Sequence, residues 1–329
     1  MYVHYFGLLS SISLLIAGSP SVAPTEDLTV EELPPRLFAL DRYPSETKMN
    51  AYSKPEYISD IANVLKGKPE MQFLLDSPFG ELFKIPKNKA SFNAKLVLGL
   101  ICRQLVTKKV NEMWIVFGGH PIRFGLREFS ILTGLECGKY PKKKDVDDVI
   151  SVKPECESVW KTLFDERFGD TVPTIADLVS WLQEEESMEG WKQLALSLII
   201  LVDGVVAAHS NPNRPTSKTV EMTKNLEFFC KYPWGRVSFT RTLGRIANFQ
   251  TPYDAQKLIR GILVGSYALH GFPLALQLLA FETIPSIAKL GPDDVPNRTF
   301  AERSIHRLAS LRAIRTSRIL ECEAADEVC

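Results

Sequence analysis

Cysteine and histidine side chains are the residues of this chain that could form a nucleophilic site. A cysteine hydrolase brings together a thiolate, a histidine base and an orienting carboxylate or amide. The candidates are Cys102, Cys137, Cys230, His120, His209 and His270. Cys102 falls on the apolar side of a predicted helix, as an inert core thiol does. No local signature surrounds Cys137, and His209 and His270 fall at predicted helix ends. We therefore expect no catalytic residue and no enzyme, and the roles of Cys137 and His120 stay open.

Metal-binding and nucleotide-binding motifs are absent from the sequence. Its five histidines are dispersed and form no HxxxH or HExxH pattern, so we expect no metal site. Neither GxxxxGKS/T nor GxGxxG occurs, so we expect no cofactor. Asp203 interrupts the most apolar internal stretch, "WKQLALSLIILVDGVVAAH", where a catalytic carboxylate is one reading. Because a buried charge has to be paired, we favour a structural carboxylate with a hydrogen-bond or arginine partner, and its role stays open.

Five arginines are the candidates for contact with a ligand or partner. They are Arg123, Arg127, Arg303, Arg307 and Arg315. Arg123 and Arg127 lie in "WIVFGGHPIRFGLREFSILTGL", where an anion site could form with the backbone amides of the glycine pair 118–119. The favoured alternative is that they pair with acids such as Glu128 or Glu136 and fix a hairpin against a helix.

The C-terminal segment carries a local excess of positive charge. Residues 298–318 hold six arginines and a single acid, Glu302, a local charge of about +5. Apolar residues recur every third position, which is typical of an amphipathic helix. A solvated helix or tail is the favoured interpretation, and a basic helix for nucleic acid or an acidic partner is the sharper one. Lys plus Arg equals Asp plus Glu at 39 each, so any such binding must come from a local patch.

The elements that position these residues are predicted to be mainly α-helical, with one small β-hairpin near 113–124. Helical spacing of apolar residues recurs from 55 to about 290, and Ser91 is the expected N-cap of the helix that follows it. Two β-branched and aromatic runs joined by Gly118-Gly119 predict the hairpin. The region 254–290 reads as two apolar helices separated by Gly271-Phe272-Pro273.

The chain divides into four segments by composition. Residues 1–24 are signal-peptide-like or reflect a misplaced start codon, 25–54 are an extended lead-in, 55–290 are a single helical domain, and 291–329 are an arginine-rich tail or helix. The apolar run near the N-terminus is too short for a membrane span of about 20 residues. We expect a nuclear or cytoplasmic protein, or a secreted one if the first segment is a working signal.

Several stretches resemble the plant family called domain of unknown function 1985. They are "PPRLFALDRYP", "YSKP", "FGELFKIP", "RQLVTKKVNEMWIVFGGHPIRFGLREFSILTGLECG", "KYPWGRVSF" and "GFPLALQLLAFETIP", which span about 33 to 290. The resemblance implies a transposon-derived module of the kind often found upstream of a SUMO-protease-like domain, with no catalytic residues to carry over. Gly125 departs from the family pattern, in which a serine commonly caps the following helix.

We therefore expect a non-catalytic interaction module of a transposon-related plant protein. Its partner is a protein or a nucleic acid, bound through the arginine-rich C-terminal segment. A degenerate or partial cysteine hydrolase is one alternative, which clustering of Cys137, His120 and an acid would favour. A secreted protein of unknown role is the second alternative, which cleavage after Ala23 would favour.

Overall fold

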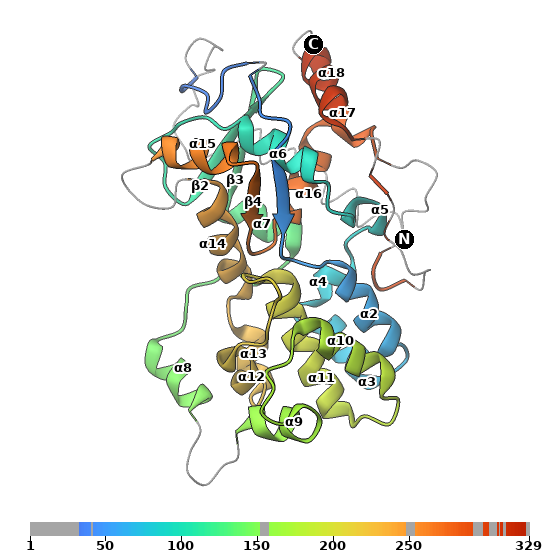
Figure 1. Ribbon diagram of the computed structural model, residues 1–329. Helices are drawn as coiled ribbons and strands as arrows, with labels where there is room; N and C mark the ends of the chain where they lie inside the picture. Colours follow the sequence, from blue (N-terminus) through green and yellow to red (C-terminus); the bar gives the residue numbers. More distant parts are fainter. Residues whose placement is uncertain are drawn as a thin grey trace, which may run out of the picture.

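The computed structural model describes residues 33–40, 42–151, 158–247, 254–291, 299–302, 308, 310–311 and 314–326 (Figure 1). Over these residues the chain is mainly helical and contains a small antiparallel hairpin, which confirms the predicted fold class. The signal-like segment 1–24 lies outside the described residues. None of the described helices is both long enough and apolar enough to cross a membrane.

The first helices arise from the apolar patterns seen in the sequence. They are α2 (Glu56–Val64), α3 (Pro69–Asp76), α4 (Gly80–Phe83), α5 (Lys87–Ala90) and α6 (Ala94–Cys102). α6 begins after Asn93, whose Oδ1 accepts a hydrogen bond from the Leu96 amide at 2.8 Å. The prediction of Ser91 as its N-cap is therefore wrong. Ser91 follows the last residue of α5, and its carbonyl accepts a hydrogen bond from the Gln277 side chain at 2.9 Å.

The predicted hairpin and the helix after it are present. They are β2 (Glu112–Phe117), β3 (His120–Gly125) and α7 (Leu126–Thr133). Gly118 and Gly119 make the turn with φ values of 53° and 78°, a backbone conformation that favours glycine. The amide of Gly125 donates to Glu128 Oε2 at 2.9 Å, so a glutamate in the first turn fixes the start of α7.

The rest of the described chain is largely helical. Its helices are α8 (Lys143–Ile150), α9 (Val159–Phe168), α10 (Ile175–Glu184), α11 (Gly190–Ile199), the π-helix η2 (Ile200–Val206), α12 (Ser217–Met222), α13 (Leu226–Lys231), α14 (Trp234–Ile246), α15 (Ala255–Leu263), α16 (Leu274–Thr283), α17 (Pro285–Ala288) and α18 (Thr316–Asp326). α11 runs directly into η2, so the apolar stretch around Asp203 ends in a π-helix.

A second pair of strands joins two distant parts of the sequence. β1 (Lys48–Ala51) pairs in parallel with β4 (Ser266–Leu269), with Lys48 opposite Ser266 and Ala51 opposite Leu269. The reading of 254–290 as helices broken only at 271–273 is corrected here, because β4 lies between α15 and α16. Pairing with β1, a partner far away in the sequence, stabilises the extended conformation of β4.

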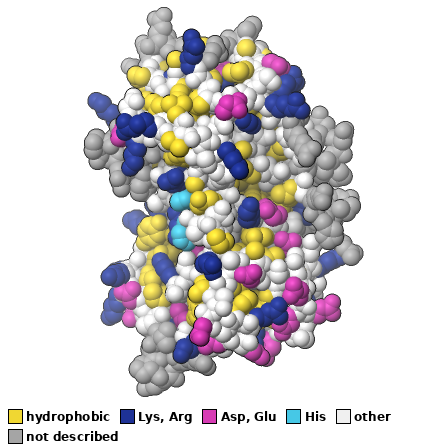
Figure 2. Space-filling view, in the orientation of Figure 1, with side chains coloured by type: hydrophobic (Ala, Val, Ile, Leu, Met, Phe, Trp, Pro, Cys, Tyr) yellow, Lys and Arg dark blue, Asp and Glu magenta, His cyan; other side chains and the backbone are white. Residues whose placement is uncertain are grey.

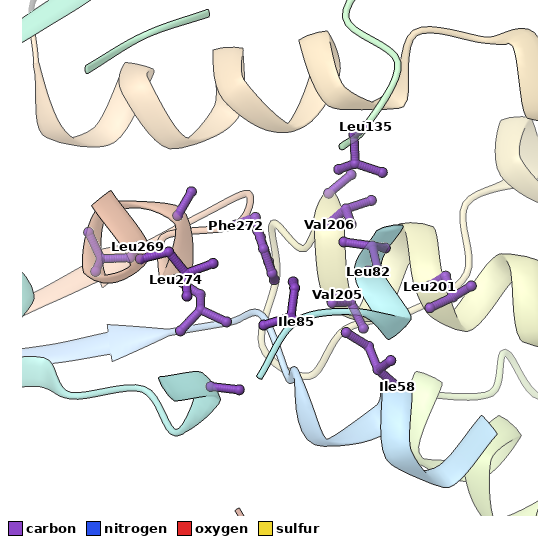
Figure 3. Close-up of a cluster of buried hydrophobic side chains, with 14 of the residues drawn as sticks. Ile58, Leu82, Ile85, Leu135, Leu201, Val205, Val206, Leu269, Phe272 and Leu274 are labelled. Atoms are coloured by element: carbon purple, nitrogen blue, oxygen red, sulfur yellow. The ribbon is translucent and has the colours of Figure 1, made fainter. Parts of the chain in front are cut away.

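The core is continuous from the first helices to the last strand. Figure 3 shows side chains of α2, α4 and η2 meeting in one cluster, with Phe272 and Leu274 beside them. The labelled members are Ile58, Leu82, Ile85, Leu135, Leu201, Val205, Val206, Leu269, Phe272 and Leu274. Each is at most 5% exposed. Apolar burial at about 25 cal/mol per Å² is what holds these elements together.

The C-terminal helix α18 is anchored on α6 by a buried ion pair. Glu323 Oε2 accepts hydrogen bonds from Arg103 Nε at 3.0 Å and from Nη2 at 2.5 Å. The Arg103 guanidinium also lies 4.2 Å from the centre of the Tyr43 ring. Ile319 packs beside Gly99 of α6, so α18 belongs to the folded body.

Candidate functional site

The arginines of the hairpin are engaged within the fold. Arg123 donates to Glu128 Oε1 from Nε at 3.2 Å and from Nη2 at 2.7 Å, the pairing favoured from the sequence. Arg127 is exposed on α7. The turn offered as an anion site faces an acidic residue of α18, because a Cβ added to Gly118 would lie 2.5 Å from the Cβ of Asp326.

Of the three candidate arginines of the C-terminal segment, Arg315 alone lies within the part of the chain that the structure describes. Arg303 and Arg307 lie outside the described residues. Arg315 is exposed immediately before α18. Within α18, Arg318 pairs with Glu321, so part of the positive charge of this segment is balanced locally.

The cysteines among the described residues lie in environments that disfavour thiolates. Burial raises the pKa of Cys102 to about 12. Burial also raises the pKa of Cys137 to about 11, and its Sγ packs where a Cβ of Gly235 would lie, at 2.5 Å. His120 lies in the hairpin opposite Phe117. Among the described residues, no hydrogen bond joins a cysteine to a histidine, so the triad geometry of a cysteine hydrolase is not assembled there.

Asp203 is a buried carboxylate in the π-helix, with a side chain held by the N-terminus of α12. The residue is 2% exposed, and its Oδ2 accepts from the Thr216 amide at 2.8 Å while its Oδ1 accepts from Thr219 Oγ1 at 3.2 Å. Burial raises its pKa to about 6, opposed by these hydrogen bonds and by the charge of Arg241. These partners match the structural carboxylate favoured from the sequence.

The end of the π-helix leads from Asp203 to a group of basic and aromatic side chains. Arg241 of α14 donates to the carbonyl of Ala207 and lies 3.2 Å from His209 Nδ1. Partial burial and then the charge of Arg241 lower the pKa of His209. The ring of His270, just after β4, stacks on Tyr52, with centroids 5.2 Å apart and planes 24° apart.

His270 responds to the same positive charges. Burial, and then the charges of Arg245, His209 and Arg241, lower its pKa to about 4. We call these four residues (Arg241, Arg245, His209 and His270) the arginine–histidine face. Burial is the larger cause of this shift, and the arginine charges that add to it create a positive potential that favours a bound anion. Figure 2 shows histidine side chains near the middle of this view with basic side chains around them, whereas acidic side chains gather lower on the molecule.

Close approach of two segments creates this face. Gly271 has φ of 69°, and its amide donates to the Ala208 carbonyl at 2.7 Å. A Cβ at this position would lie 2.5 Å from the Ser238 carbonyl oxygen, so only glycine lets the chain after β4 lie against α14. His209 and His270 thereby reach the same side of α14, although they come from different parts of the chain.

An open hollow of about 490 Å³ adjoins the face. Its lining residues are Asn50, Tyr52, Asn211, Arg245, Gly261, Val264, Ser266, Tyr267 and Ala268. Arg245 Nε donates to the Ala268 carbonyl at 3.1 Å, and its guanidinium lies 5.2 Å from the centre of the Tyr267 ring. Val264 and its neighbour Leu263 are 80% and 60% exposed and form an apolar rim. Among the described residues, the lining of the hollow contains one cation, Arg245, and no acidic side chain.

Sequence reasoning missed this site, because its residues come from β1, β4, α14 and loops that are far apart along the chain. One signal was available. The α14 sequence "WGRVSFTRTLGRI" contains three arginines and no acid. Its apolar and small residues Trp234, Gly235, Ser238, Phe239, Leu243 and Ile246 are buried, which leaves the arginines on the outer half of the helix.

Of the comparisons with known proteins, a family model matches part of this chain. No curated protein and no solved structure matches the chain. Among the described residues, no group of three or more His, Cys, Asp or Glu side chains is placed to hold a metal ion. Residues 101–245 match the family model described as a domain of unknown function, DUF1985. This range contains Asp203, His209, Arg241 and Arg245, whereas Tyr52 and His270 lie outside it. The segment from 101 to 245 is therefore a DUF1985 domain.

Proposed function

We propose that this chain is a non-catalytic module that binds an anionic protein or nucleic acid through the arginine–histidine face and the adjoining hollow. The observation that carries the proposal is the composition of the hollow, which places Arg245 among aromatic and neutral polar side chains without an acid among the described lining residues. An arginine in such surroundings attracts a carboxylate or a phosphate and can hold it with two parallel hydrogen bonds.

The electrostatics of the neighbouring histidines support this proposal. Arg241 and Arg245 lie close enough to His270 to lower its pKa. The same charges that disfavour an imidazolium favour an anion at that position, because both effects depend on one local potential. Binding therefore needs no whole-chain positive charge, in keeping with a formal net charge of zero.

The environments of the thiols favour a binding module over a cysteine hydrolase. A nucleophilic cysteine needs a lowered pKa and a base nearby. Burial raises the pKa of both Cys137 and Cys230 to about 11, the opposite of that requirement. His209 contacts Arg241 and His270 stacks on Tyr52, so their contacts in the structure are with an arginine and a tyrosine.

Transposon-related plant origin is part of the proposal, and its support is the sequence resemblance described above. The arginine-rich C-terminal segment is the second contact surface to be considered, because Arg315 and Arg318 are exposed at α18. α18 itself is anchored by the buried Arg103–Glu323 pair. A test of this segment therefore has to change its charges and leave the helix in place.

The test is fluorescence polarisation of the full chain with two labelled polyanions, a single-stranded oligonucleotide and polyglutamate, over a salt series. We expect binding that weakens with salt, and weaker binding by Arg245→Gln. Arg167→Gln is the matched control, because Arg167 is a surface arginine that pairs with Glu184 away from the hollow. Absence of binding to both polyanions would refute the proposal. Loss of binding in an Arg315→Gln/Arg318→Gln double variant, with Arg245→Gln unaffected, would move the contact surface to the C-terminal segment.

A further inference from the structure

The hollow combines aromatic rings, a cation and neutral polar groups. Two aromatic rings, Tyr52 and Tyr267, line it together with the Arg245 guanidinium. Asn50 and Ser266 add an amide and a hydroxyl, joined by a hydrogen bond of 2.9 Å from Asn50 Nδ2 to Ser266 Oγ. A volume of about 490 Å³ lies in the range of about 300–1,000 Å³ that is typical of small-ligand sites.

We infer that the hollow holds one nucleotide unit of a single-stranded nucleic acid, with the base against Tyr52 and a backbone phosphate on Arg245. This inference rests on the proposed function and specifies its ligand. Proteins that bind single strands combine aromatic side chains, on which bases stack, with cations that follow the backbone. An acidic peptide would use the cation alone, because it has no base to place against Tyr52.

The aromatic platform is held in position before any ligand binds. One side of Tyr52 stacks on His270 at 5.2 Å between centroids. The Tyr52 amide donates to the Leu269 carbonyl at 3.1 Å, and its carbonyl accepts from Asn213 Nδ2 at 2.8 Å. Because the backbone and one ring face are already fixed, a base that stacks on Tyr52 loses little free energy to ordering the protein.

The cation is held in the same way. Arg245 Nε donates to the Ala268 carbonyl, and the Tyr267 hydroxyl donates to the Arg245 carbonyl at 2.5 Å. A guanidinium also carries donors on both Nη atoms, and Arg245 lines the hollow. The geometry therefore places phosphate-binding groups beside a stacking surface on one side of the β1–β4 pair.

Two further cations lie on the same elements as residues that line the hollow. Arg241 lies on α14 one turn before Arg245, and Lys48 is exposed at the start of β1, two residues from Asn50. In the inferred complex, Arg241 and Lys48 are the candidates for contact with the phosphates on either side of the bound unit. A duplex keeps its bases stacked inside, so it cannot offer one to Tyr52 without opening.

The test compares three labelled probes on the full chain by fluorescence polarisation: oligothymidylate, an abasic phosphodiester strand of equal length, and polyglutamate of equal charge. We expect oligothymidylate to bind about 10-fold more tightly than the abasic strand, since one stacked base contributes on this order. Tyr52→Leu should remove this difference, and Tyr52→Phe, which keeps the ring, should preserve it. Urea unfolding of Tyr52→Leu alongside the wild type shows whether the variant is folded.

Three outcomes would overturn the inference, and they are distinguishable from failure of the proposed function. Equal affinity for oligothymidylate and the abasic strand, or a Tyr52→Leu variant that keeps the difference, would leave anion binding intact and remove base stacking. Tighter binding of polyglutamate than of either strand would identify an acidic protein as the partner. If none of the probes binds, both the inference and the proposed function fail. For Arg245→Gln we also expect the slope of log affinity against log salt to fall by about 0.7, which is the loss of one phosphate contact.

Discussion

Replacement of Asp203 by asparagine tests the electrostatics of the π-helix. The carboxyl is 2% exposed, and its two oxygens accept hydrogen bonds from the Thr216 amide and the Thr219 hydroxyl. Asparagine has nearly the same shape and keeps one oxygen as an acceptor. Asp203→Asn therefore removes the ionisation of the side chain and changes the packing little.

The magnitude follows from the pKa of Asp203, which burial raises from 3.8 to about 6 in the folded protein. A difference of about 2 pKa units corresponds to about 3 kcal/mol of folding free energy. Because the folded-state pKa is raised, the folded protein binds this proton more tightly than the unfolded chain does. The stability associated with the protonated carboxyl is full below about pH 4 and is lost as the pH rises through about 6.

Urea unfolding of both proteins between about pH 4 and pH 8 measures this effect. Relative to the wild type, we expect Asp203→Asn to gain about 3 kcal/mol in free energy of unfolding over that range. Asp177→Asn is the control of opposite sign, because hydrogen bonds from Thr174 lower the pKa of Asp177. In a series extended below about pH 4, that variant should lose relative stability as the pH rises to about 4, and above pH 4 its curve should run parallel to that of the wild type. Parallel stability curves for the wild type and Asp203→Asn would refute the reasoning.

Two further predictions concern the C-terminal helix and the cysteines. Glu323→Ala should lower the free energy of unfolding by about 3 kcal/mol in urea unfolding, because it leaves Arg103 buried without its carboxylate. Glu321→Ala, at an exposed pair, should cost under about 1 kcal/mol, and an equal loss in both variants would contradict a special role for Glu323. Cys137, with a pKa raised from 9.0 to about 11, should have a thiolate fraction about 100-fold below that of an ordinary thiol, measured by its labelling rate with a thiol reagent. Labelling of Cys137 as fast as that of a free thiol would instead reopen the hydrolase alternative.

The parts of the fold that could be predicted depend on neighbours in the sequence. The hairpin follows from two β-branched and aromatic runs around a glycine pair, and both glycines have positive φ. The pairing of Arg123 with Glu128 follows from their proximity along the chain. A hydrogen-bonded position for Asp203 follows from the cost of burying a carboxylate without partners.

The parts that could not be predicted depend on distant contacts. β4 has four residues between two helices, and its pairing with β1 has no local signal. The π-helix differs from an α-helix by a hydrogen-bond shift that the apolar pattern does not encode. Tyr52 and His270 stack only because β1 and β4 pair, so no spacing rule would have placed them together.

Three departures from local rules converge at one place in this molecule. The π-helix, the buried carboxylate of Asp203 and the isolated parallel strand pair all border the arginine–histidine face. Each is costly, since an α-helix, an apolar residue or a longer sheet would satisfy folding more simply. Costly local choices in natural proteins are concentrated where a site has to be shaped. Arg241 connects them, because it bonds to the carbonyl of Ala207 at the end of η2, attracts Asp203 and contacts His209. This convergence, independent of the composition of the hollow, is a second reason to place the binding surface of the module here.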